Sequence, residues 1–174
     1  MERPHYAIFA SVHGHTNKNS EISRHENRAV HRQGGTMGKR LVTLTTCQWA
    51  DLPFEELCKT AKEMGYDGLE IATWGNFDLD RAYEDDSYVE YILATLKKYG
   101  LVCKALAAHI IGQCVGDAPD PRLNNFAPAA LADKPAEIRA WAIASMKKVP
   151  YVAKKMGVGV VTGFTGSPIW RYLY

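Results

Sequence analysis

Two side chains combine reactive chemistry with a position in or just after an apolar run. Glu70 lies within Gly68–Thr73, and His109 directly follows Leu101–Ala108. A carboxylate between two large apolar residues is costly to bury unless it is paired or hydrogen-bonded. A histidine that follows small residues has room for a ligand or substrate beside it. Glu70 and His109 are therefore the candidate catalytic residues.

Each candidate has a structural alternative. Glu70 could be a hydrogen-bond partner for Thr43 or Thr45 of a neighbouring strand, and His109 could be a satisfied polar group of the core. Cys47 is a poor candidate nucleophile, because the chain after residue 36 holds no second histidine to activate it. No nucleotide-binding glycine motif follows any apolar run.

The segments that carry these residues alternate between two periodicities. Short β-branched or apolar runs predict four strands, at Leu41–Thr46, Gly68–Thr73, Leu101–Ala108 and Val158–Gly163. Helical spacing of apolar residues predicts three helices between them. The first begins near Asp51 and Pro53, the second near Asp86, and the third has Asp133 as its cap and a kink at Pro150. Helix after strand, three times over, predicts parallel strands with right-handed crossovers.

Strand parity separates the two parallel architectures. One face would carry large apolar residues: Val42, Leu44, Leu69, Ile71, Val102 and Leu106. The other would carry small or polar residues: Thr43, Thr45, Cys47, Glu70, Ala72, Cys103, Ala105, Ala107 and His109. A doubly wound sheet is apolar on both faces of its central strands, whereas a barrel has a crowded inner face that often carries the site. The pattern favours a (β/α)8 TIM-type barrel over the doubly wound alternative.

A barrel places its site at the C-terminal ends of the strands. This rule selects four groups of residues at strand ends: Cys47–Trp49, Thr73 and Trp74, His109, and Thr162–Ser167. The candidate substrate-binding residues are Gln48, Trp49, Trp74, Gln113, Phe164 and Thr165. The run Gly163–Ser167 could bind an oxyanion through backbone N–H groups or form an ordinary turn.

Charge and cysteine usage limit the partners. The chain holds 21 Lys/Arg and 19 Asp/Glu, of which five Lys/Arg and three Asp/Glu lie in residues 1–36. Residues 37–174 therefore hold sixteen residues of each sign. A neutral body gives no electrostatic reason to expect a nucleic-acid or membrane partner, and no apolar run approaches the ~18 residues of a membrane span. Four cysteines without a C-x-x-C pair predict reduced thiols and a cytoplasmic protein.

The first 36 residues lack helical or strand periodicity, and Met37 precedes the first strand-like run. We expect residues 1–36 to be a leader that is disordered or not native, and the domain to span residues 37–174. The alternatives are a metal site at His13 and His15, which lacks the ligand spacing of structural zinc sites, and a transit peptide, which the three glutamates disfavour.

Three segments carry a resemblance to a known family. Gly65–Glu70 (GYDGLE), Ala107–Gln113 (AAHIIGQ) and Gly163–Pro168 (GFTGSP) resemble the sugar phosphate isomerase/epimerase family. That family belongs to the xylose-isomerase-like TIM barrel superfamily, which also contains the endonuclease IV type of DNA-repair enzyme. The resemblance covers Met37 to Tyr174.

The resemblance implies a divalent-metal enzyme with Mn²⁺, Mg²⁺ or Co²⁺ that moves a proton next to the carbonyl of a sugar or polyol. In the family, the metal ligands come mainly from strands five to eight. Only two residues of this sequence therefore match functional residues of the family: Glu70 matches the acidic residue of strand two, and His109 matches the histidine of strand three. In the endonuclease branch that histidine binds metal, so His109 is a possible ligand here.

Three readings of the whole chain remain open. The first is the N-terminal half of a sugar isomerase or epimerase, inactive by itself and without tight Mn²⁺ binding. The second is an AP-endonuclease-like enzyme, which the neutral, histidine-poor body disfavours. The third is a non-catalytic half-barrel whose edge strands pair with a second copy, and a homo-oligomer is expected.

Overall fold

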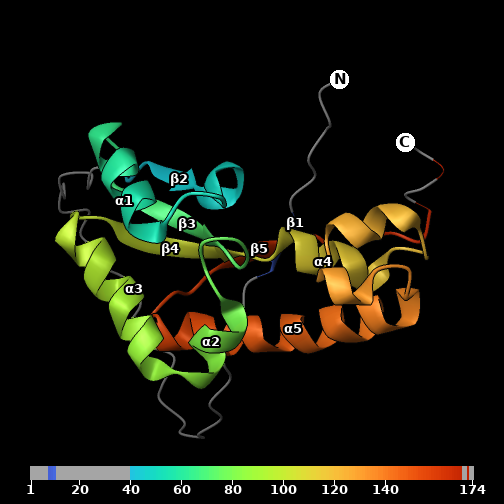
Figure 1. Ribbon diagram of the computed structural model, residues 1–174. Helices are drawn as coiled ribbons and strands as arrows, with labels where there is room; N and C mark the ends of the chain where they lie inside the picture. The colour runs from blue at the N-terminus through green and yellow to red at the C-terminus, as the bar shows by residue number, and fades with distance from the viewer. Residues whose placement is uncertain (1–7, 11–39, 170–171, 173–174) are drawn as a thin grey trace, which may run out of the picture.

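A computed structural model describes residues 8–10, 40–169 and 172 of the chain. Four parallel strands follow one another across a sheet: β2 (Thr43–Thr45), β3 (Gly68–Ala72), β4 (Val102–Ala107) and β5 (Val161–Gly163). Helices separate the strands along the chain (Figure 1). This arrangement confirms the predicted α/β class with parallel strands and helical crossovers.

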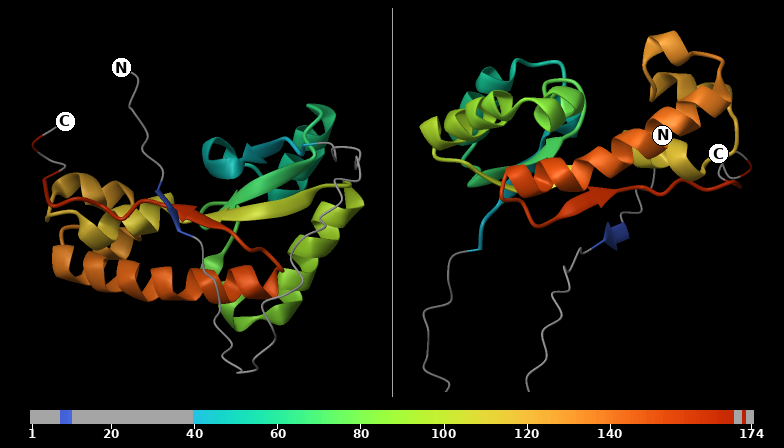
Figure 2. Two further views of the ribbon diagram at one scale, coloured as in Figure 1. Left: turned by 180° about the vertical axis from the view of Figure 1, so that it is seen from behind. Right: turned by 90° about the horizontal axis from the view of Figure 1, so that it is seen from below.

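The helices on the crossovers are α1 (Phe54–Glu63), α2 (Leu79–Glu84), α3 (Asp86–Lys98), α4 (His109–Gly116) and α5 (Pro135–Lys155). Three short 3-10 helices join them: η1 (Thr46–Trp49), η2 (Pro121–Asn125) and η3 (Ala129–Leu131). The long helices α1, α3 and α5 lie on one side of the sheet (Figure 2). Helices on a single face are typical of a barrel wall and not of a doubly wound sheet.

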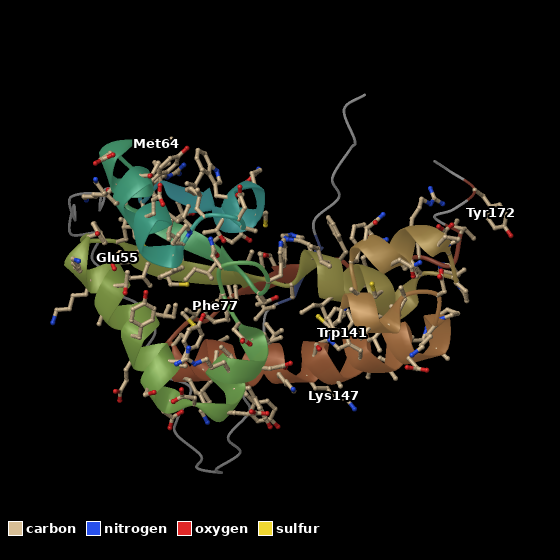
Figure 3. All side chains as sticks on the ribbon, viewed as in Figure 1. Glu55, Met64, Phe77, Trp141, Lys147 and Tyr172 are labelled. Carbon is tan, nitrogen blue, oxygen red and sulfur yellow. The ribbon has the colours of Figure 1, made fainter. Side chains whose placement is uncertain are left out.

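The core lies between this face of the sheet and the helices. Leu69, Ile71 and Leu106 point from the strands and have no exposed surface, and Ile92 of α3 and Val149 of α5 meet them with none either. Burying each such side chain contributes roughly 1.5–3 kcal/mol. Figure 3 labels two further residues of the core: Phe77 before α2, which is 1% exposed, and Trp141 of α5, which is partly buried and packs against the core. Helix α5 runs unbroken through Pro150, at which the sequence predicted a kink.

A β-bulge in β4 changes which residues face the helices. Leu69 pairs with Cys103, but Glu70 pairs with Ala105, so Lys104 is an extra residue. Val102 therefore shares the inner face with Gly68, and Cys103 packs against the core on the helix face. The sequence assigned these two residues to the opposite faces, which was wrong because an alternating pattern does not reveal an inserted residue.

Two helices and one helix start also differ from the prediction. Helix α2 begins after Asp78, whose carboxylate accepts the Arg81 N–H at 2.9 Å, and α4 occupies part of the predicted loop after His109. Helix α1 begins at Phe54 with Pro53 as its N-cap, three residues after Asp51. Helix α5 has Lys134 as its N-cap; the predicted cap, Asp133, has a φ of 61° and bonds Asn124 instead.

The first 36 residues contribute one described element. Strand β1 (Ile8–Ala10) pairs antiparallel with β5, a pairing that the sequence did not predict. The rest of the predicted leader, including His13 and His15, lies outside the described residues, so the domain boundary at Met37 stays a prediction. Among the described residues, no helix is both long and apolar enough to span a bilayer.

Candidate functional site

His109 lies where β4 gives way to α4, at the C-terminal end of the parallel strands. The sequence predicted it as the last inward-facing residue of a strand, but it is the first residue of α4, with Ala108 as the N-cap. The backbone thus turns into a helix one residue before the site. His109 still lies at the edge of the sheet where a barrel carries its chemistry.

Two aromatic rings from neighbouring loops flank His109. The Trp74 ring, which follows β3, meets the imidazole edge-on at a centroid distance of 6.4 Å. The Phe164 ring, which follows β5, lies at 4.7 Å with a 58° tilt. All three side chains are half-buried. The structure thus brings together three of the predicted site residues from three separate strand ends.

Cys47 is the fourth member of this group. Its Sγ lies 4.0 Å from Nδ1 of His109 and accepts the hydroxyl of Thr45 at 3.1 Å. The sequence argument found no second histidine for Cys47 and overlooked that His109 itself could be its neighbour. Burial raises the pKa of the Cys47 thiol, the Thr45 hydrogen bond opposes this, and the Glu70 charge raises it further. Because a protonated thiol is a poor nucleophile, the structure does not favour Cys47 as a nucleophile.

Glu70 faces the inner side of the sheet, as predicted, but its partner is neither Thr43 nor Thr45. The hydroxyl of Thr162, on β5, donates a hydrogen bond to Oε1 of Glu70. The side chain reaches over β4, where only Ala105 and Ala107 stand between the two strands. Glu70 acts electrostatically on the Cys47 thiol, which in turn contacts His109. Its carboxylate is thus part of the same neighbourhood.

The other predicted binding residues lie outside the ring cluster. Gln48 is exposed on η1, and the carbonyl of Trp49 accepts a hydrogen bond from Asn76 at 3.0 Å. The Gln113 amide donates to Asp117 at 2.6 Å. Thr165 is exposed, and its hydroxyl donates to the carbonyl of the next residue. The predicted binding roles of these four residues stay predictions.

The loop after β5 is pressed against α4, backbone to backbone. A Cβ on Gly112 would lie 1.8 Å from the Phe164 carbonyl oxygen, and one on Gly116 would lie 2.3 Å from that of Thr165. Asp117, which is 3% exposed, accepts the N–H of Ser167 at 2.5 Å. This N–H, one of those considered for an oxyanion site, is therefore used to fix the loop.

Sequence reasoning missed Asp117 altogether and missed the role of Thr162 as the partner of Glu70. Asp117 holds the loop through Ser167 and the Gln113 amide, while Arg139 donates to its backbone oxygen at 2.8 Å. The signal available for Asp117 was that it directly follows Gly116, which lies four residues after Gly112. Thr162 lies in the strand-end range Thr162–Ser167 that the sequence selected, but its pairing with Glu70 had no signal, since a threonine in a strand is ordinary.

The described residues do not supply a metal centre by themselves. Nowhere in residues 8–10, 40–169 and 172 do three or more His, Cys, Asp or Glu side chains gather closely enough to hold an ion. Glu70 is hydrogen-bonded to Thr162, and His109 has Cys47 at Nδ1. The residues present therefore do not fit the divalent metal that the family resemblance implies.

Parallel strands, helices on one face and side chains at the strand ends define part of an α/β barrel. The family model described as "Xylose isomerase-like TIM barrel" matches residues 58–172, about two thirds of the chain. The chain belongs to this family. Its members are mostly enzymes, and many depend on a metal. No curated protein matches the chain.

Proposed function

We propose that the chain belongs to a sugar isomerase or epimerase, and that His109 and the rings beside it form part of the substrate site. The observation that carries the proposal is the position of His109 between Trp74 and Phe164, at the strand ends of a xylose isomerase-like barrel. Enzymes with this architecture bind their substrates at that end of the strands.

The ring cluster suits a small polyhydroxylated ligand. Aromatic faces such as those of Trp74 and Phe164 can cover the C–H groups of a sugar and exclude water from them. The imidazole of His109 provides a hydrogen bond to a hydroxyl or carbonyl oxygen among these apolar surfaces. Apolar walls with few convergent polar groups are typical of small-molecule sites.

Proton transfer next to a carbonyl requires a positioned acid or base. Glu70 and His109 are the residues we assign to that work: Glu70 as the carboxylate on the inner face and His109 as the group that holds the substrate oxygen. The Thr162 hydroxyl donates a hydrogen bond to Oε1 of Glu70, which holds the carboxylate in place on the inner face. Among the described residues, no group of three or more His, Cys, Asp or Glu side chains could hold a metal ion. The proposed roles therefore use only Glu70 and His109.

Ligand-observed NMR tests the proposal without requiring turnover. Saturation-transfer difference spectra of the full chain with aldoses, ketoses and polyols should show transfer to the sugar C–H protons. Trp74→Leu and Phe164→Leu should abolish this transfer. Tyr151→Leu is the matched control, since Tyr151 is 61% exposed on α5 and away from the strand ends.

Two results would contradict the proposal. One is the absence of transfer to every sugar and polyol at millimolar concentration. The other is saturable binding of an abasic-site DNA duplex together with no sugar binding, which would favour the endonuclease branch of the superfamily.

A further inference from the structure

Cys47 and His109 lie in contact although 62 residues separate them in the sequence. Cys47 lies in η1 after β2, and His109 opens α4 after β4. The 4.0 Å between Sγ and Nδ1 is at the outer limit of a hydrogen bond that involves sulfur. Thr45 donates its hydroxyl to the same sulfur at 3.1 Å. Thr45, Cys47 and His109 thus form a row of contacting side chains.

The hydrogen bonds of the row can be satisfied with Cys47 as the donor to His109. The sulfur accepts from Thr45 and has a single hydrogen of its own, which can be donated to Nδ1. Burial raises the pKa of the Cys47 thiol, so the sulfur keeps this hydrogen at neutral pH. A neutral imidazole that accepts at Nδ1 carries its own hydrogen on Nε2.

The rings beside His109 restrict the orientation of the imidazole. Phe164 lies against one side at 4.7 Å between centroids, and Trp74 meets it edge-on at 6.4 Å. A half-turn of the imidazole would place a carbon where Nδ1 now lies and remove the contact with sulfur. The flanking rings therefore fix the plane of the imidazole, and the contact with sulfur distinguishes between its two flipped orientations.

We propose that Cys47 is a positioning residue for His109: its S–H donates to Nδ1 and holds the imidazole in the tautomer with the hydrogen on Nε2. His109 then presents a neutral N–H donor, which is suited to a carbonyl or hydroxyl oxygen of the substrate. The substrate part rests on the proposed function, whereas the tautomer is a property of the unliganded chain.

Long-range ¹H–¹⁵N spectra of the ¹⁵N-labelled full chain test the tautomer directly, at a pH at which titration shows the ring to be neutral. The other five histidines all precede residue 37, and the signals that disappear in His109→Phe identify His109. We expect Nε2 to resonate as a protonated nitrogen and Nδ1 as an unprotonated one. In Cys47→Ala both nitrogens should move toward the averaged positions of exchanging tautomers.

Cys114→Ala is the matched control, because Cys114 is a buried thiol of α4 and should leave both His109 nitrogens in place. A hydrogen on Nδ1 in the wild-type chain overturns the proposal, and this spectrum decides even if Cys47→Ala does not fold. Unchanged nitrogens in a folded Cys47→Ala overturn it as well. Sugar binding is measured separately, so either proposal can fail while the other stands.

Discussion

Glu70 of β3 and Thr162 of β5 are hydrogen-bonded to each other although β4 lies between their strands. On the inner face of β4, the side chains at this point are only the methyl groups of Ala105 and Ala107, which leave space above the strand. The carboxylate can therefore cross the strand, and the inner face becomes a connected polar surface next to Cys47 and His109. Small residues in β4 thus determine which partner Glu70 finds.

Thr162→Val keeps the shape of the side chain but removes the donor to Glu70. We expect the free energy of unfolding to fall by about 1–3 kcal/mol, because a partly buried carboxylate loses its hydrogen bond. Glu70→Gln should cost less, since the amide oxygen can still accept from Thr162. Urea denaturation measures both. A larger loss in Glu70→Gln than in Thr162→Val would mean that the charge, and not the hydrogen bond, determines stability here.

Gly112→Ala tests the close approach of the β5 loop to α4. The added Cβ would lie 1.8 Å from the Phe164 carbonyl oxygen, so the loop must move away. We expect a loss of about 1–3 kcal/mol or more in unfolding free energy. Gly159→Ala is the control, since nothing lies within 4 Å of a Cβ there. If the two variants have the same melting temperature, the loop does not pack as described.

Asp117→Ala removes the acceptor for both Ser167 N–H and the Gln113 amide. Two donors then lose their partner in a buried place, and we expect a loss of about 2–5 kcal/mol. Asp117→Asn should be milder, because its oxygen can still accept from Ser167. Hydrogen exchange of the Ser167 amide should accelerate in Asp117→Ala. Unaltered exchange at Ser167 would contradict the assigned role of Asp117.

The thiols should resist alkylation in the folded chain. Burial raises the pKa of Cys58 to about 12 and those of Cys103 and Cys114 to about 11, and it also raises that of Cys47. Only the thiolate reacts, so the rate should be low at pH 8 and increase as the pH rises toward these values. A thiol-specific chromogenic reagent should count four thiols rapidly in denaturant only. A thiol that reacts in the folded chain as fast as free cysteine would contradict this.

The sequence predicted the strands because β-branched runs and helix-ending glycines are local signals. It did not predict α4, since His109–Gly116 contains two glycines and three β-branched residues, which oppose a helix. Packing against α5 and the β5 loop outweighs that local preference. The bulge at Lys104 was equally invisible, because parity assumes an uninterrupted strand.

The candidate site could be predicted in its positions but not in its pairings. The rule of strand ends selected His109, Trp74 and Phe164, which the structure brings together. The contacts of Cys47 with His109 and of Glu70 with Thr162 join residues 62 and 92 positions apart. Such pairs depend on strand register and side-chain length, and neither can be read from one sequence.

The central claim is that His109 binds the substrate, and comparing the sugar affinity of the wild-type chain with that of His109→Phe tests it most directly. His109→Phe retains a ring between Trp74 and Phe164 but cannot hydrogen-bond a substrate oxygen. Losing that hydrogen bond should weaken binding about tenfold, with little change in melting temperature. Titration of wild-type chain and variant with the sugar that binds best provides both affinities. Equal affinities would contradict the account and remove His109 from the site.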